Sequence, residues 1–234
     1  MFRIRPRATV LALVLAALLA GTAACKGKGP GPAGDLPAGD GLLKESATAM
    51  RGVQTVNFAI EADGTVSGIA LRRAGGTLTR DGKAKGSAQV EQFGTNVELQ
   101  FVVVGDSIYL KGATGGYQKI PLELASSVYD PSAILDPDRG VAKLLDTATE
   151  ARSEGREKVN GTDSYRVSAK LEREALSAIV PGVTEDTPGQ LWIAADSKRL
   201  LKAKVGVPGE GGKTTNVTVT FTDFDKPADI SVPS

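Results

Sequence analysis

The stretch GTVSGIALRRAGGTLTRDGKAKGSAQVEQFGTNVELQFVVV, residues 64–104, decides the fold. Gly and Asp-Gly turns divide it into short segments, and toward its end every second residue is apolar, at Val97, Leu99, Phe101 and Val103. A repeat of two residues sends successive side chains to opposite faces of a strand, and Gly-containing pairs form tight turns. The stretch therefore predicts consecutive antiparallel strands with one apolar face.

The same pattern continues on both sides of this stretch. Upstream, Phe58, Ile60 and Ala62 alternate with polar residues, after a helix predicted over residues 42–51. Downstream, turn residues predict further hairpins, and helical spacing predicts short helices. The predicted hairpins cover residues 106–120, 156–171, 189–207 and 213–225, and the short helices cover residues 141–148 and 172–179.

Many strands and few helices favour an α+β fold with helices on one face of a long antiparallel sheet. Antiparallel sheets with alternating patterns bury one face. About three short helices are too few to cover a sheet of this length. The sheet therefore either curls until it closes on itself or leaves its concave face partly open as a cavity.

The first 24 residues have the composition of a secretory leader. Three arginines precede an uncharged, mostly apolar run over residues 8–20, which is shorter than the about 20 residues that a transmembrane helix needs. Small residues then lead to Cys25, and the motif resembles the lipobox of bacterial lipoproteins, whose cysteine is acylated and becomes the mature N-terminus. Thr22 departs from that motif, which usually has an aliphatic residue there. The alternative is an ordinary leader followed by a free thiol.

Residues 25–41 combine the predicted acylated Cys25 with a tether rich in Gly and Pro. The segment after the cysteine has no apolar repeat and cannot contribute to a core. Fully extended, it would reach about 50 Å. Residues 42–234 then form the predicted folded domain.

The composition excludes several classes of function. The chain has 0 histidines and a formal net charge of +1. Without histidine, Ser-His-Asp and Cys-His catalysis is impossible, and the usual metal ligands are missing because acylation consumes Cys25. A near-neutral chain also argues against a nucleic-acid partner. We therefore predict a protein that is not an enzyme, with no metal and no cofactor.

Acidic residues offer two weaker alternatives. Asp130, Asp136 and Asp138 lie close together, but their spacing does not match a calcium loop, and aspartates beside prolines favour turns and helix caps. A lipid- or sugar-cleaving enzyme would need a carboxylate pair in the cavity. The strand carboxylates Glu61, Glu91 and Glu98 alternate onto the face opposite the apolar one.

Four blocks of the sequence together resemble the LppX/LprAFG family of actinobacterial lipoproteins. They are FVVVGDSIYLK, VYDPSAILDPDRGVAKLL, EGREKVNGTDSYRVSAKL and LWIAADSKRLLKAKV, downstream of the lipobox and tether. The resemblance implies a strongly curved antiparallel half-barrel similar to carriers of the LolA/LolB type, with helices over its concave face and a hydrophobic cavity. It also implies a lipid carrier at the outer face of the plasma membrane, in the cell envelope. Its expected cargo is an acylated glycolipid or triacylglycerol, and a major-facilitator exporter is an expected partner.

The resemblance also implies where the lipid is held. In the family, an apolar side chain on the strand matching GSAQVEQF projects into the cavity, at the position of Ala88, and Val90 shares its face. The helix-rich insert around Ile134, Leu135, Val141, Leu144 and Leu145 would form the cover and the mouth of the cavity. We expect a monomer, and the alternative is a structural or adhesion lipoprotein with a solid core. The expected cavity residues are Phe58, Ile60, Ala88, Val90, Leu99, Phe101, Val103, Ile134, Leu135, Val141, Leu144 and Leu145.

Overall fold

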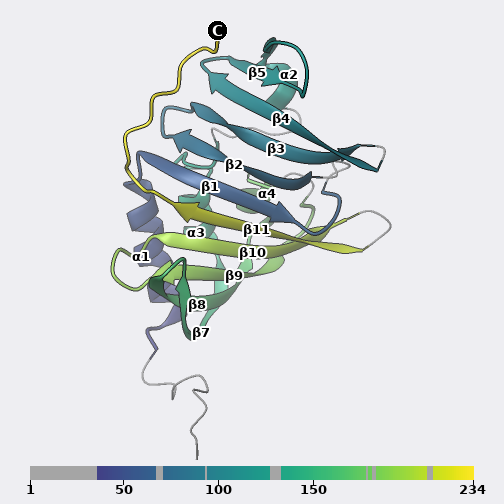
Figure 1. Ribbon diagram of the computed structural model, residues 1–234. Coiled ribbons are helices and arrows are strands. Elements are labelled where there is room, and N and C mark those ends of the chain that lie inside the picture. The colour runs from purple at the N-terminus through teal and green to yellow at the C-terminus, as the bar shows by residue number, and fades with distance from the viewer. Residues whose placement is uncertain are drawn as a thin grey trace, which may run out of the picture. The chain divides into compact units, whose positions relative to one another are not determined.

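Figure 1 shows the fold as a computed structural model of the chain. It describes residues 36–66, 71–92, 94–126, 133–177, 179–180, 183–209 and 213–234. All of these belong to one compact unit, Asp35–Ser234. The predicted leader, Cys25, most of the tether and Asp130 lie outside the described residues.

One antiparallel sheet dominates the described residues. Its 11 strands follow the order β6-β5-β4-β3-β2-β1-β11-β10-β9-β8-β7, so the N-terminal and C-terminal series of strands meet where β1 pairs with β11 (Figure 1). The order ends at β6 and β7 without joining them, so the sheet is open rather than closed on itself. The strands are β1 (Thr55–Ala62), β2 (Leu71–Thr79), β3 (Ala84–Gln92), β4 (Thr95–Val104), β5 (Ser107–Lys111), β6 (Gln118–Pro121), β7 (Thr149–Val159), β8 (Thr162–Leu171), β9 (Thr187–Ala194), β10 (Leu200–Pro208) and β11 (Thr214–Thr222).

The helices pack on one face of this sheet. Helix α1 contacts β7, β9 and α3, while α3 also contacts β8 and α4, and α2 contacts β5 and β6. Figure 1 shows α1, α3 and α4 on the far side of the sheet from the viewer. In the described part of the chain, no helix is long and apolar enough to cross a bilayer. The helices are α1 (Gly39–Arg51), α2 (Leu122–Ser126), α3 (Val141–Thr147) and α4 (Arg173–Ser177).

Helix α1 begins at Gly39, three residues earlier than the sequence predicts. A Cβ atom at Gly39 would lie 2.6 Å from the carbonyl carbon of Ala151 in β7, so only glycine permits this close contact. Asp40 then lies in the first turn, where a negative charge favours the helix. The predicted apolar stripe is confirmed, with Leu42, Leu43, Ala47 and Met50 all buried.

Some glycines that the sequence assigns to turns lie inside strands instead. Gly76 of β2 pairs with Gly86 of β3. A Cβ atom at Gly86 would lie 2.1 Å from the carbonyl oxygen of Gly75, and one at Gly76 would lie 2.2 Å from that of Lys85. The two backbones therefore approach more closely than side chains allow. Glycines of this kind permit a sheet to bend, as a half-barrel requires.

Candidate functional site

The register of the strands brings the predicted apolar residues onto one face of the sheet, which we call the apolar face. Ile60 pairs with Ala74, Ala74 with Ala88, and Ala88 with Leu99. Residues directly opposite in an antiparallel pair share a face, and so do residues two apart in one strand. Every predicted strand residue lies on this face, namely Phe58, Ile60, Ala88, Val90, Leu99, Phe101 and Val103.

The apolar face has two parts that differ in burial. Along β1 and β8–β11 it packs under the helices, and Val167 and Leu191, for example, are 0% exposed. Over β3–β6, some apolar side chains are only half-buried and lie outside the core that the described residues form. We call these residues the outer apolar strip: Ala88, Val90, Val97, Leu99, Leu110 and Ile120.

The predicted cover residues all lie in the helix layer. Ile134 and Leu135 precede α3, Val141 begins it, and Leu144 and Leu145 form its inner face. Each is at most 4% exposed, and all share one core with α1 and the sheet. The structure thus brings these residues into one packed cluster with Phe58, Ile60, Phe101 and Val103, but not with Ala88, Val90 and Leu99.

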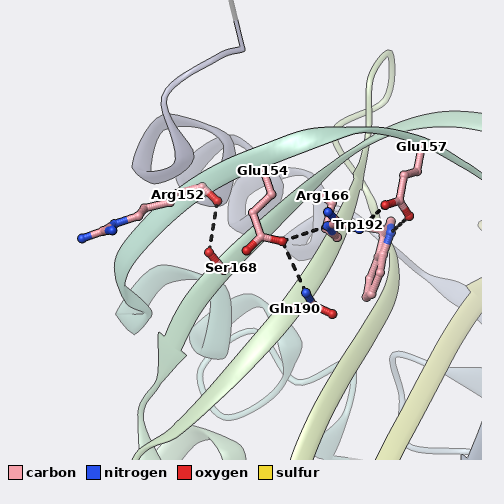
Figure 2. Close-up of polar contacts among 7 residues, drawn as sticks. All are labelled: Arg152, Glu154, Glu157, Arg166, Ser168, Gln190 and Trp192. Carbon is pink, nitrogen blue, oxygen red and sulfur yellow. Dashed lines mark hydrogen bonds and ion pairs between the residues drawn. The ribbon is translucent and has the colours of Figure 1, made fainter. Parts of the chain in front are cut away.

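The opposite face of the sheet, which we call the polar face, carries a network that stabilises the edge strand β7 (Figure 2). Arg166 of β8 forms ion pairs with Glu154 and Glu157 of β7. The indole Nε1 of Trp192 donates to Glu157 Oε2 at 2.8 Å, and the Lys202 ammonium lies 4.5 Å from the centre of the ring. Trp192 is therefore only 5% exposed, although it lies outside the main core.

The strand carboxylates also lie on the polar face. Glu61 lies opposite Arg73 and Thr218, and Glu98 lies opposite Gln89. Both alternate with residues of the apolar face, as Glu91 does, so none of them contributes to a carboxylate pair there. Among the described residues, no group of His, Cys, Asp or Glu is arranged to hold a metal ion.

Asp136 caps the turn before α3, as the sequence predicts. Its Oδ1 accepts hydrogen bonds from the backbone N–H groups of Asp138 at 2.9 Å and Arg139 at 3.1 Å. Burial alone would raise the pKa of Asp136, but these bonds and the Arg139 guanidinium hold it below its usual range. The carboxylate therefore has a structural role.

Ser46 is an exception in the apolar layer. Its side chain is 0% exposed on the inner face of α1, and its Oγ has no hydrogen-bond partner in the described part of the protein. A buried hydroxyl without a partner costs about 1–3 kcal/mol.

We expect Ser46→Ala to stabilise the lipid-free protein by about 1 kcal/mol, because it removes this cost and improves helix propensity. Thermal unfolding of the delipidated protein measures the effect. The matched control is Thr48→Ala on the same helix, whose Oγ1 donates to Lys44 O at 3.0 Å. A lower melting temperature for Ser46→Ala would show that the hydroxyl has a partner in solution.

Sequence reasoning missed several members of the apolar face. Ala74, Leu110 and Ile120 join it through the pairing of β2, β5 and β6. Alternation within each short segment was the available signal, since Leu110 is two residues from Ile108. In β6, which has 4 residues, the alternation is too short to assign a face.

The comparison with known families decides where this chain belongs. The family model described as LppX_LprAFG lipoprotein matches residues 38–230. The chain belongs to this family. The match includes every strand and helix that the structure describes.

Two curated relatives illustrate the family. A protein of Mycolicibacterium smegmatis named lipoarabinomannan carrier protein LprG is 32% identical over 98% of both chains. The protein of the same name from Mycobacterium tuberculosis strain H37Rv is 24% identical over 95% of this chain and 94% of its own length. The similarity therefore extends over nearly the whole chain.

Two solved structures share the fold. LprF from Mycobacterium bovis has a TM-score of 0.72 at 23% identity and covers 84% of this chain and 97% of its own. LppX from Mycobacterium tuberculosis has a TM-score of 0.61 at 18% identity, over 82% of this chain and 97% of its own. The α+β half-barrel with helices on the concave side of an open antiparallel sheet is therefore confirmed.

Proposed function

We propose that this protein is a membrane-anchored lipid carrier that shelters acyl chains against the outer apolar strip. The proposed cargo is an acylated glycolipid or triacylglycerol, and the anchor is the lipid on Cys25 at the outer face of the plasma membrane. The observation that carries the proposal is the half-buried apolar strip beside a fully packed core. Apolar side chains that gather on one face and stay partly exposed are suited to bind an apolar ligand.

The energetics suit a carrier. Each methylene that moves from water to an apolar surface contributes about 0.8 kcal/mol, so one long acyl chain contributes on the order of 10 kcal/mol. Extraction from a bilayer exchanges one apolar medium for another, so its net driving force is small. A carrier therefore depends on proximity to the membrane, which the anchor and tether would supply.

The relatives support this role. Those named lipoarabinomannan carrier protein match nearly the whole chain, and the family is one of lipoproteins. We infer that this chain acts as a monomer, without catalysis, and moves its cargo from the plasma membrane toward the outer envelope. A major-facilitator exporter is the proposed partner for that step.

Mass spectrometry of organic extracts tests the proposal. The chain from Lys26 onward lacks the acylation site and can be purified without detergent. We expect it to retain acylated lipid at close to one lipid per chain. An extract without acyl lipid would instead support the structural lipoprotein with a solid core.

We expect Cys25→Ser to abolish acyl labelling and to release the protein from the membrane fraction, because one thioether-linked diacylglyceryl group would supply the anchor. Metabolic labelling with a fatty acid followed by membrane fractionation measures both. Thr22→Leu, which restores the usual lipobox residue, is the control and should keep or increase labelling. Membrane retention of an unlabelled Cys25→Ser variant would contradict the proposed anchor.

A further inference from the structure

The chain after β11 crosses the polar face as a strap, which we define as Asp223–Ser234. Asp223 and Asp225 adopt left-handed backbone conformations, with φ of 51° and 58°, directly after β11 ends. Thr55 Oγ1 donates to Lys226 O at 2.6 Å, and Ile230 is 7% exposed. Figure 1 shows this segment running past the ends of the strands toward the C-terminus. The strap is thus attached at two separate points.

A cavity of about 320 Å³ lies between the strap and the sheet. The strands contribute Asn57, Thr77 and Lys85 to its lining, and the strap contributes Asp223 and residues 226–230. Small-molecule pockets in proteins begin at about 300 Å³. The cavity therefore has room for a ligand the size of a mono- or disaccharide.

A hydrogen-bonded chain pre-organises one wall of this cavity. Thr77 Oγ1 donates to Asn57 Oδ1 at 2.7 Å, and Asn57 Nδ2 donates to Asp223 Oδ2 at 2.9 Å. Lys226 forms an ion pair with the same carboxylate. The bonds from Lys226 and Asn57 hold the pKa of Asp223 below its usual range, so it remains an acceptor.

Two opposite charges in the lining, Lys85 and Asp229, make no direct side-chain bond, although the charge of Asp229 helps to raise the pKa of Lys83 after the bond that Lys83 makes to Asp81. Within the described residues, neither the Lys85 ammonium nor the Asp229 carboxylate makes a side-chain hydrogen bond or ion pair. The lining contains two lysines and two aspartates, so its net charge is zero. An anion is therefore only weakly attracted to it. Hydroxyl groups both donate and accept, and therefore suit a donor and an acceptor that face one cavity.

We propose that this cavity binds a neutral saccharide unit, whose hydroxyls bond Lys85 and Asp229 and whose apolar ring face packs on Pro227 and Ala228. The proposal deepens the proposed function and rests on it for the source of the sugar, the glycan of a glycolipid cargo. Asn57 and Lys85 directly adjoin Phe58 and Gly86 of the apolar face, close to the strand ends.

Binding of α-1,6-mannobiose and of an arabinofuranose disaccharide to the full-length protein, measured by saturation-transfer NMR and calorimetry, tests the proposal. These sugars are chosen because relatives are named lipoarabinomannan carriers. Each lost bond to a charged group is expected to weaken binding by about tenfold. We therefore expect Lys85→Ala and Asp229→Asn each to raise Kd about tenfold. Lys204→Ala, an exposed lysine of the polar face in β10, should leave Kd unchanged.

The outcomes separate this proposal from the carrier function. Retention of triacylglycerol by Lys85→Ala together with loss of disaccharide binding would support both. Disaccharide binding that persists in a variant with a blocked apolar strip would support the saccharide site alone. If neither disaccharide binds the folded wild-type protein at millimolar concentration, or if inorganic phosphate binds there instead, the saccharide proposal is wrong.

Discussion

Ala88→Trp is expected to lower the amount of bound lipid by at least about tenfold while the protein stays folded. Ala88 lies in the outer apolar strip between Ala74 and Leu99. A tryptophan there adds about 200 Å² of side-chain surface where an acyl chain would lie. Loss of contact for two methylenes already costs a factor of about ten in affinity. The lipid-to-protein ratio in organic extracts measures the effect.

Gln89→Trp is the matched control for this variant. Gln89 is the next residue of the same strand, and its partners Arg73 and Glu98 place it on the polar face. The same bulk at that position should leave the lipid ratio unchanged. Equal lipid content in both variants and the wild type would exclude Ala88 from the binding site.

Gly86→Ala is expected to destabilise the protein by about 3 kcal/mol or to prevent folding. The added Cβ would lie 2.1 Å from the carbonyl oxygen of Gly75 and 2.9 Å from the Cα of Gly76. Both are backbone atoms, so β2 and β3 must separate to admit the methyl group, and overpacking of this kind costs about 1–3 kcal/mol or more. Denaturant unfolding followed by circular dichroism measures the loss.

Gly155→Ala is the control, because Gly155 also lies in a strand but has no atom within 4 Å of the added Cβ. Its substitution should be neutral or stabilise the protein by up to about 1 kcal/mol. Similar stabilities for the two alanine variants would show that the close approach of β2 and β3 does not hold in solution.

The strands were predictable because their signals are local. The alternation that ends in Val103 identified β4. The hairpin predicted over residues 156–171 rests on the turn pair Asn160-Gly161, and both of these residues have positive φ in the β7–β8 turn. The Gly75-Gly76 pair resembles a turn but lies inside β2. A local pattern cannot distinguish a turn from a strand that passes close to another backbone. That distinction depends on Gly86, which approaches only once β2 and β3 pair.

The candidate site was predictable in part. Alternation placed Leu99 and Phe101 on one face, but the sequence could not show that Phe101 packs against the core while Leu99 stays half-buried outside it. That difference depends on which strands the helices cover. Trp192 is a second example, because it is buried on the polar face by Glu157 of β7 and Lys202 of β10 rather than by its own segment.

Photo-crosslinking tests the carrier proposal most directly. A triacylglycerol with a diazirine in the middle of one acyl chain is loaded onto the protein, irradiated, and the modified residues are mapped by peptide sequencing. We expect labels on Val97 and Leu99, which lie on the apolar face of β4, and none on Glu98 and Gln100, which alternate with them. Labels spread over both sets, or confined to the polar face, would contradict the proposal.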